Sequence, residues 1–162
     1  HYEIKAPKSL RLKIDDHKSD LSVEGFDGRV IVETHKGSLE ASKLSGEIVL
    51  DTHKGDFNVT EISGNIEVNT HKGEITLEAL KLEGRSRLET YKGNINLSVP
   101  ESLAFTVVAD LGKRADFDSD FKISYRRNWR HDDDDYFFEQ EINGGGPEVI
   151  FKSSKGRIRL RN

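Results

Sequence analysis

The residues of this chain that could do chemistry recur in four near-identical tetrapeptides, each of which places a ring and a lysine before a glycine. They are residues 34–37, 52–55 and 70–73, which read Thr-His-Lys-Gly, and residues 90–93, which read Thr-Tyr-Lys-Gly. Lysine carries a positive charge, and histidine is a hydrogen-bonding ring that gains a charge near neutral pH. The pattern indicates an anion-binding surface with these candidate residues: Lys36, Lys54, Lys72, Lys92, His35, His53 and His71.

The elements that must position these residues are short β-strands. Glycine recurs every nine residues from Gly28 to Gly73 and then, after a two-residue insertion, at Gly84 and Gly93. In most units between successive glycines, two apolar residues flank one polar residue, as in residues 66–68, Ile-Glu-Val. This alternation is that of a half-buried strand and not of a helical face. Each nine-residue unit is therefore one strand followed by a turn that glycine marks.

Two such units make an 18-residue repeat. The repeat predicts an all-β, single-domain β-solenoid, with two short strands in each 18-residue coil and two facing parallel sheets. We expect regular coils over about residues 10–99, irregular strands and a loop over 100–146, and a closing coil over 147–162, within one domain of residues 1–162. By the same alternation, the threonines of the four tetrapeptides point inward, where their hydroxyls can bond the turn backbone.

In a parallel stack, equivalent residues of successive coils lie one above another at about 4.8 Å. A column of lysines is therefore expected along one edge, with Lys18 as its first member and His17 beside it. Glu33, Asp51 and Glu89 precede the lysines by three residues and are expected to neutralise part of their charge. Three interpretations are open: a solvated edge without a ligand, an anion-binding edge, and a histidine metal site that lacks a carboxylate or cysteine at the same corner.

The irregular segment still shows strand-like alternation at residues 105–107 and 121–125. Residues 128–135 interrupt it, and we expect them to form the tip of a loop or hairpin. The four aspartates at 132–135 are interpreted as a solvated tip, because calcium loops space their carboxylates at alternate positions. Trp129 lies near arginines and is expected either to pack on their stems or to meet a sugar or protein partner.

The last strand of the chain alternates Arg157, Arg159 and Arg161 with apolar residues. Charged side chains on an edge strand discourage another chain from pairing with it. We therefore expect the closing coil to be the exposed end of the stack.

The composition excludes several classes of function. A net charge of −4 over 162 residues favours neither nucleic acid nor an anionic membrane as a partner, and no apolar run approaches the roughly 20 residues of a membrane span. Cysteine is absent, which excludes disulfides and thiol chemistry, and methionine is absent, so we expect a processed piece of a longer product. The sequence shows neither paired carboxylates nor a nucleophile with a base. It therefore predicts no enzymatic activity, no metal site and no cofactor.

Three features carry a resemblance to a known family: the coils of pattern Gly-x-Ile-x-Val-x-Thr-x-x-Gly, the drifting segment after Val99 and Pro100, and the closing residues 155–160. Together they resemble the adhesin-like domain family of bacterial envelope proteins, a β-solenoid family. The resemblance covers nearly the whole chain and implies an exported protein of the periplasm or cell surface. It leads us to expect an interaction module that binds an anionic glycan, an envelope polymer or another protein. The alternative is a structural spacer that assembles through its terminal coils.

Overall fold

The computed structural model describes residues 11–123, 128–129 and 136–162. Within these ranges the chain forms strands and turns without a helix, which confirms the all-β prediction, and so no helix there could cross a membrane. The strands are β1 (Arg11–Lys18), β2 (Leu21–Lys36), β3 (Leu39–Lys54), β4 (Phe57–Lys72), β5 (Ile75–Leu82), β6 (Arg85–Lys92), β7 (Ile95–Ser98), β8 (Phe105–Ser119), β9 (Asn128–Trp129), β10 (Tyr136–Ile142) and β11 (Glu148–Arg161).

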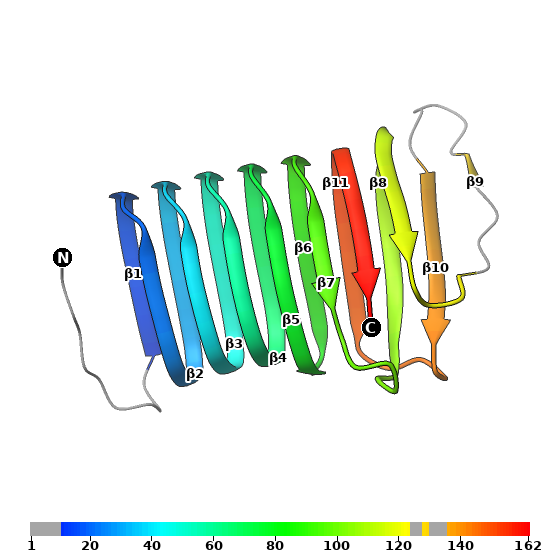
Figure 1. Cartoon of the computed structure of the whole chain (residues 1–162), viewed down its shortest axis with the longest axis horizontal. Helices are drawn as coiled ribbons and strands as arrows, with labels where there is room; N and C mark the ends of the chain where they lie inside the picture. The colour runs from blue at the N-terminus through cyan, green and yellow to red at the C-terminus, as the bar shows by residue number, and fades with distance from the viewer. Residues whose placement is uncertain (1–10, 124–127, 130–135) are drawn as a thin grey trace.

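The first strands stack in parallel, each offset from the next by one repeat (Figure 1). Val30 lies opposite Ile48, and Ile48 lies opposite Ile66, an offset of 18 residues in both cases. The two-residue insertion is absorbed by register shifts beside Ile62, where β4 meets β5. After it, equivalent residues still face each other, since Thr70 of β4 pairs with Thr90 of β6.

Each long strand occupies both faces of the stack. β2, β3 and β4 are 16 residues long, and in Figure 1 each runs along one face, bends round the lower edge and returns along the other. At the bend Gly25, Lys43 and Glu61 adopt left-handed φ angles of 69°, 56° and 53°, and pairing continues beyond it, with Gly28 opposite Gly46. The expected pair of short strands is therefore one strand that bends, because a single left-handed residue turns the backbone without ending the ladder.

The apolar core lies between the two faces. The inward residues Val30, Ile48 and Ile66 are almost completely buried, with exposed fractions of 0, 0 and 1%. The threonines of the four tetrapeptides are buried as well, which confirms their inward orientation. Thr34 Oγ1 donates a hydrogen bond to the carbonyl oxygen of Lys36 at 3.2 Å, whereas the other three threonine hydroxyls have no partner among the described residues.

The order of the last strands differs from the prediction. β11 lies inside the stack, with β6 and β7 on one side and β8 on the other (Figure 1). Phe151 of β11, for example, faces Leu88 of β6 and Ala109 of β8. After β7 the chain leaves the next position in the stack empty and continues as β8 one position further along. The C-terminal strand β11 then occupies the empty position. The expectation that the closing coil forms the end of the stack is wrong, since β10, paired antiparallel with β8, lies beyond it.

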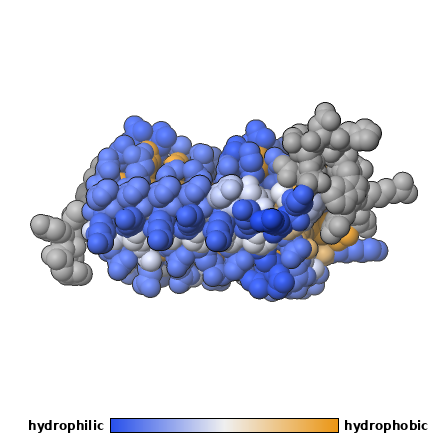
Figure 2. Space-filling view, turned by 90° about the horizontal axis from the view of Figure 1, so that it is seen from above, coloured by the Kyte–Doolittle hydropathy of each residue, from blue (hydrophilic) through white to orange (hydrophobic). Residues whose placement is uncertain are grey.

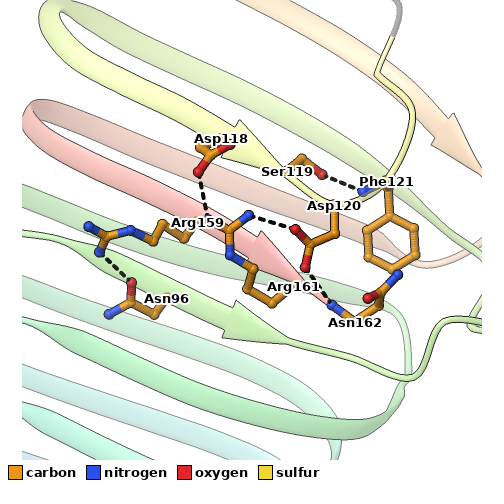
Figure 3. Close-up of polar contacts among 8 residues, drawn as sticks. All are labelled: Asn96, Asp118, Ser119, Asp120, Phe121, Arg159, Arg161 and Asn162. Carbon is orange, nitrogen blue, oxygen red and sulfur yellow. Dashed lines mark hydrogen bonds and ion pairs between the residues drawn. The ribbon is translucent and has the colours of Figure 1, made fainter.

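Two of the three alternating arginines of β11, Arg159 and Arg161, consequently contact neighbouring segments and do not protect an edge (Figure 3). Arg161 Nη1 lies 2.9 Å from Asp120 Oδ1, and its Nη2 lies 2.5 Å from Asp118 Oδ2. On the other side, Arg159 Nη1 donates to Asn96 Oδ1 at 3.1 Å. The prediction failed because a strand with charges on its outer face looks the same in sequence whether it is an edge or an interior strand with charged neighbours.

The irregular segment is more regular than its sequence suggests. β8 is a parallel strand whose inward residues Val107, Ala109 and Leu111 are fully buried. Residues 121–123 do not form the expected strand; Phe121 instead packs edge-on against Phe105, with ring centroids 5.7 Å apart. Residues 124–125, the side chain of Trp129 and the aspartates at 132–135 lie outside what the structure describes.

Candidate functional site

The candidate residues lie along one edge of the stack, which we call the turn edge: the upper edge in Figure 1, where successive strands end in lysine. Glycine is required there by close approach of successive turns. The amide of Gly55 donates to the carbonyl oxygen of Lys72 at 3.1 Å, and a Cβ on Gly55 would collide with the carbonyl oxygen of Gly37. With the backbones packed this closely, the ring and lysine side chains can only point outward.

The rings of this edge form a continuous stack, which we call the ring column: His17, His35, His53, His71 and Tyr91. Successive ring centroids are 5.0, 5.0, 4.9 and 4.9 Å apart, and the ring planes are within 4° of parallel. Each inner ring is covered on both faces by its neighbours, so that only ring edges face solvent. The ammonium of Lys155 lies 5.5 Å from the centroid of Tyr91 and covers the end of the stack.

The lysines form a second row, the lysine column: Lys18, Lys36, Lys54, Lys72 and Lys92. Each lies opposite the next in the strand register, as the repeat predicted. The row continues beyond the predicted residues, with Lys155 opposite Lys92 and Arg114 opposite Lys155. Lys155 precedes a glycine, as Lys36, Lys54, Lys72 and Lys92 do, a signal that was present in the sequence. Arg114 carried no such signal, because the register between β8 and β11 shifts beside it.

The positive charges of the lysine column are not paired within the described part of the chain, where no ion pair involves any of its five members. The carboxylates expected to neutralise them have other partners. Glu33 lies 3.2 Å from Lys13, Glu89 pairs with Arg87, and Asp51 accepts a hydrogen bond from the side chain of Asn69 at 2.9 Å. Figure 2, which looks onto this edge, shows an evenly spaced row of hydrophilic residues.

On the other side of the ring column runs an acidic column: Asp15, Glu33, Asp51, Asn69 and Glu89, one residue per repeat. Its first three members and the rings of His17, His35 and His53 line an open groove of about 750 Å³. Across the turn edge the order is therefore carboxylate, ring, lysine in every repeat except the fourth, where Asn69 replaces the carboxylate. The sequence suggested the carboxylates only as neighbours of lysine and not as a column of their own.

The stack also affects the ionisation of His35. Desolvation of the His35 ring between its two stacked neighbours lowers its pKa below the ordinary value, and the charges on His17, His53 and Lys36 lower it further. His35 is thereby held in its neutral form at neutral pH, with one hydrogen-bond donor and one acceptor on its ring.

A metal site does not fit this geometry. Among the described residues, no group of three or more His, Asp or Glu side chains is arranged to hold a metal ion. Zinc binds imidazole nitrogens at about 2.0–2.1 Å, whereas parallel rings about 5 Å apart hold their nitrogens too far from a shared ion. What the edge can offer is a periodic array of charges and hydrogen-bonding groups.

Residues 6–161 match the family model described as Toastrack DUF4097. The match includes the irregular segment and β11 as well as the regular repeats. No curated protein matches the chain, and no solved structure does.

Proposed function

The chain belongs to the Toastrack DUF4097 family, and from this premise we propose that it is a non-enzymatic interaction module whose turn edge binds an anionic glycan or envelope polymer. The candidate contact residues are Lys36, Lys54, Lys72, Lys92, His35, His53 and His71. An adhesin-like role in the periplasm or at the cell surface is part of this proposal and rests on the sequence resemblance.

The architecture that presents the edge is, in our interpretation, a flattened β-solenoid with two facing parallel sheets. Its support is the constant parallel register of β1 to β4, the single bend in each long strand and the buried row of aliphatic residues between the faces. In such a stack each repeat repositions the same side chains by one strand spacing, so that one turn sequence generates a whole binding surface.

The observation that carries the proposal is the row of unpaired lysines in strict register along the turn edge. Adjacent ammonium groups about 5 Å apart repel one another by only about 1 kcal/mol in water, so the row is tolerable without a ligand. A polymer with many negative charges would contact several lysines at once, whereas a small anion would gain only one or two contacts. Binding of a polyanion by several weak contacts is the function that this arrangement supports best.

The experiment compares two variants with the same change of net charge. In the first, Lys36, Lys54, Lys72 and Lys92 are replaced by Gln. In the matched control, four exposed cations away from the edge are replaced by Gln: Lys43, Lys81, Lys122 and Arg85. On an array of anionic and neutral glycans, the unaltered protein and the control should retain an anionic polymer, and the edge variant should lose it.

The interaction should also weaken steeply as salt is added, because exposed charges are screened over about 10 Å at 0.1 M ionic strength. Acidification should strengthen it, since protonated rings add positive charge beside the lysines. Because the pKa of His35 is lowered, this gain should begin at a lower pH than for an ordinary histidine. Retention of the polymer by the edge variant would remove the turn edge from consideration.

The second candidate function is a structural spacer that assembles end to end. It is favoured by the first strand, because β1 pairs with β2 alone and no other described strand pairs with its second edge. Leu12 and Ile14 on this strand are only partly buried. A spacer should form longer particles as its concentration rises, and changes to the lysine column should leave them intact, which sedimentation velocity would show.

A further inference from the structure

We propose that the turn edge is also a self-complementary surface on which two copies of this chain pair side by side, related by a two-fold axis parallel to the stack. The inference goes beyond the binding of a polyanion and does not depend on it. It rests on the order of the three columns across the edge, which is carboxylate, ring and lysine.

A symmetric pair brings the same surface of both copies together, so that a residue at one side of the axis meets the residue at the other side. If the axis runs along the ring column, the lysine column of each copy faces the acidic column of its partner. Lys36 then faces Glu33 of the second copy, and Lys54 faces its Asp51. The same two contacts form again with the copies exchanged, because the relation is mutual.

The charges on the two surfaces repeat at the same spacing, because both copies have the same sequence and fold. Both copies repeat their charges at the separation of paired parallel strands, which is about 4.8 Å, and the rings of the column show steps of 4.9–5.0 Å. Every repeat can therefore form its contacts at the same time. A two-fold axis parallel to the stack also places each repeat at the level of its own equivalent, so no sliding is needed to bring the columns into register.

Other symmetric arrangements of the same edge are repulsive. With a two-fold axis perpendicular to the stack, in the plane of contact, each column would face itself and lysine would meet lysine. Among the five regular repeats, the arrangement with the parallel axis pairs opposite charges in four: those of Lys18, Lys36, Lys54 and Lys92. In the remaining repeat Lys72 faces an amide, since Asn69 occupies the acidic column. Beyond the regular repeats, Arg114 of β8 faces Asp110, and Lys155 of β11 faces a like charge, Lys152. At the axis, the edges of the rings meet one another.

The carboxylates have partners within their own chain, but those contacts leave them accessible. The side chain of Glu33, which lies near Lys13, is 48% exposed, and that of Glu89, which lies near Arg87, is 31% exposed. Exposed ion pairs of this kind contribute at most about 1 kcal/mol. A carboxylate can therefore be shared with a lysine of the second copy at little cost.

The expected pair is weak and sensitive to salt. Four steps of 4.9–5.0 Å give the ring column a length of about 20 Å, and the contact is only three columns wide. This strip is smaller than the roughly 800 Å² that each partner contributes to a stable interface. Dimers should therefore appear at high protein concentration and low ionic strength.

The test is an exchange of charges between the two columns. One variant carries Lys36→Glu and Lys54→Glu, and the other carries Glu33→Lys and Asp51→Lys. Each variant alone places like charges opposite one another in two repeats and should sediment as a monomer under conditions where the unaltered protein forms dimers. An equimolar mixture restores opposite charges at all these positions, so the mixture should form heterodimers.

All four substituted residues are exposed, so both variants are expected to fold, which circular dichroism and a melting curve verify. If a variant does not fold, the milder pair Lys36→Gln and Lys54→Gln should still weaken the dimer of the whole chain at least several-fold. A monomeric unaltered protein at low salt, or a mixture of variants that stays monomeric, would overturn the proposal. Failure of polyanion binding would not, since the sedimentation experiment contains no glycan.

Discussion

The regular repeats and the C-terminal region both stack parallel strands, but the order of the strands along the chain differs between them. From β1 to β4 each strand pairs with the next one along the chain, and contacts join residues 18 apart. In the C-terminal region β11 fills a place between β7 and β8, and the amide of Arg157 bonds to Asn94, 63 residues earlier. The first arrangement can grow repeat by repeat, whereas the second is complete only when the end of the chain has been placed.

The two regions nevertheless share one interior. Phe151 and Ile158 of β11 are as fully buried as Val30 and Ile48 of the regular repeats. The difference lies in connection and not in packing. Since closing a longer loop costs more conformational entropy, the C-terminal region should depend on β11 more than the regular repeats depend on any one terminal strand.

Deletion of a terminal strand should have the largest effect on stability, and the effect should differ between the two regions. Removal of residues 148–162 takes away β11 and leaves β7 and β8 with unpaired edges inside the stack, so we expect loss of most of the roughly 5–15 kcal/mol by which a domain is stable. Removal of residues 1–18 takes away β1, which pairs with β2 alone among the described strands, and should cost much less. Urea unfolding followed by circular dichroism measures both; equal losses would show that β11 is no more central than β1.

Much of this fold could be predicted from the sequence, because the relevant physics is local. The alternation in residues such as Ile66, Glu67 and Val68 indicates which side chains point inward, and the repeat indicates which residues of neighbouring strands lie opposite one another. Both follow from strand geometry and need no knowledge of distant contacts. The columns of the turn edge could be predicted for the same reason.

The place of β11 could not be predicted in this way. The sequence of β11 has the same pattern of apolar and polar residues as the repeats, and a strand with this pattern could occupy any position in the stack. In its observed place, β11 contacts groups that the repeat does not mark as its partners: Arg161 pairs with Asp118 of β8 and with Asp120 just beyond it, about 40 residues earlier in the chain. The bend without a break was missed for another reason: Lys43 and Glu61 adopt a conformation that is uncommon for residues with a side chain.

Core substitutions should have the next largest effect and should be severe in both regions. Ile66→Asp or Val68→Asp would bury an unpaired carboxylate and cost several kcal/mol, and Ile158→Asp in β11 should cost a similar amount, because all three residues are buried. Glu67→Lys on the outer face should cost less than about 0.5 kcal/mol. The midpoint of urea unfolding is the measurement. A mild effect at Ile158 alone would mean that the two regions do not share one interior.

Substitution of two glycines can distinguish two explanations of the glycine repeat: the close approach of successive turns and backbone strain. Gly55→Ala places a methyl group against the carbonyl oxygen of Gly37, and we expect a loss of about 3 kcal/mol because two backbones must move apart. Gly84 has a left-handed φ of 65° but open space around it, so Gly84→Ala should cost only about 1 kcal/mol. Thermal unfolding of the two variants gives the comparison. If Gly84→Ala proved the more damaging, backbone strain and not the approach of successive turns would explain the glycine repeat.

The smallest expected effect concerns pH and belongs to the regular repeats alone, since β11 carries Ser154 where they carry a ring. The folded pKa of His35 is lowered, chiefly by desolvation within the ring stack and then by the charges of His17, His53 and Lys36. Below the unfolded pKa of about 6.5, the unfolded chain therefore binds more protons at this residue than the folded chain does. The stabilising contribution is complete above that pH and is lost as the pH falls through the folded pKa.

The midpoint of urea unfolding should consequently fall as the pH is lowered from about 7.5 to about 5. This loss of stability should be smaller than the loss in either glycine variant. His35→Phe keeps a ring in the stack and removes the titrating group, so its midpoint should depend less on pH. A polyanion on the turn edge would favour the protonated rings and should reduce the acid loss of the unaltered protein, because a ligand that prefers the charged form raises the folded pKa. A midpoint that rises on acidification without any ligand would contradict the lowered pKa of His35.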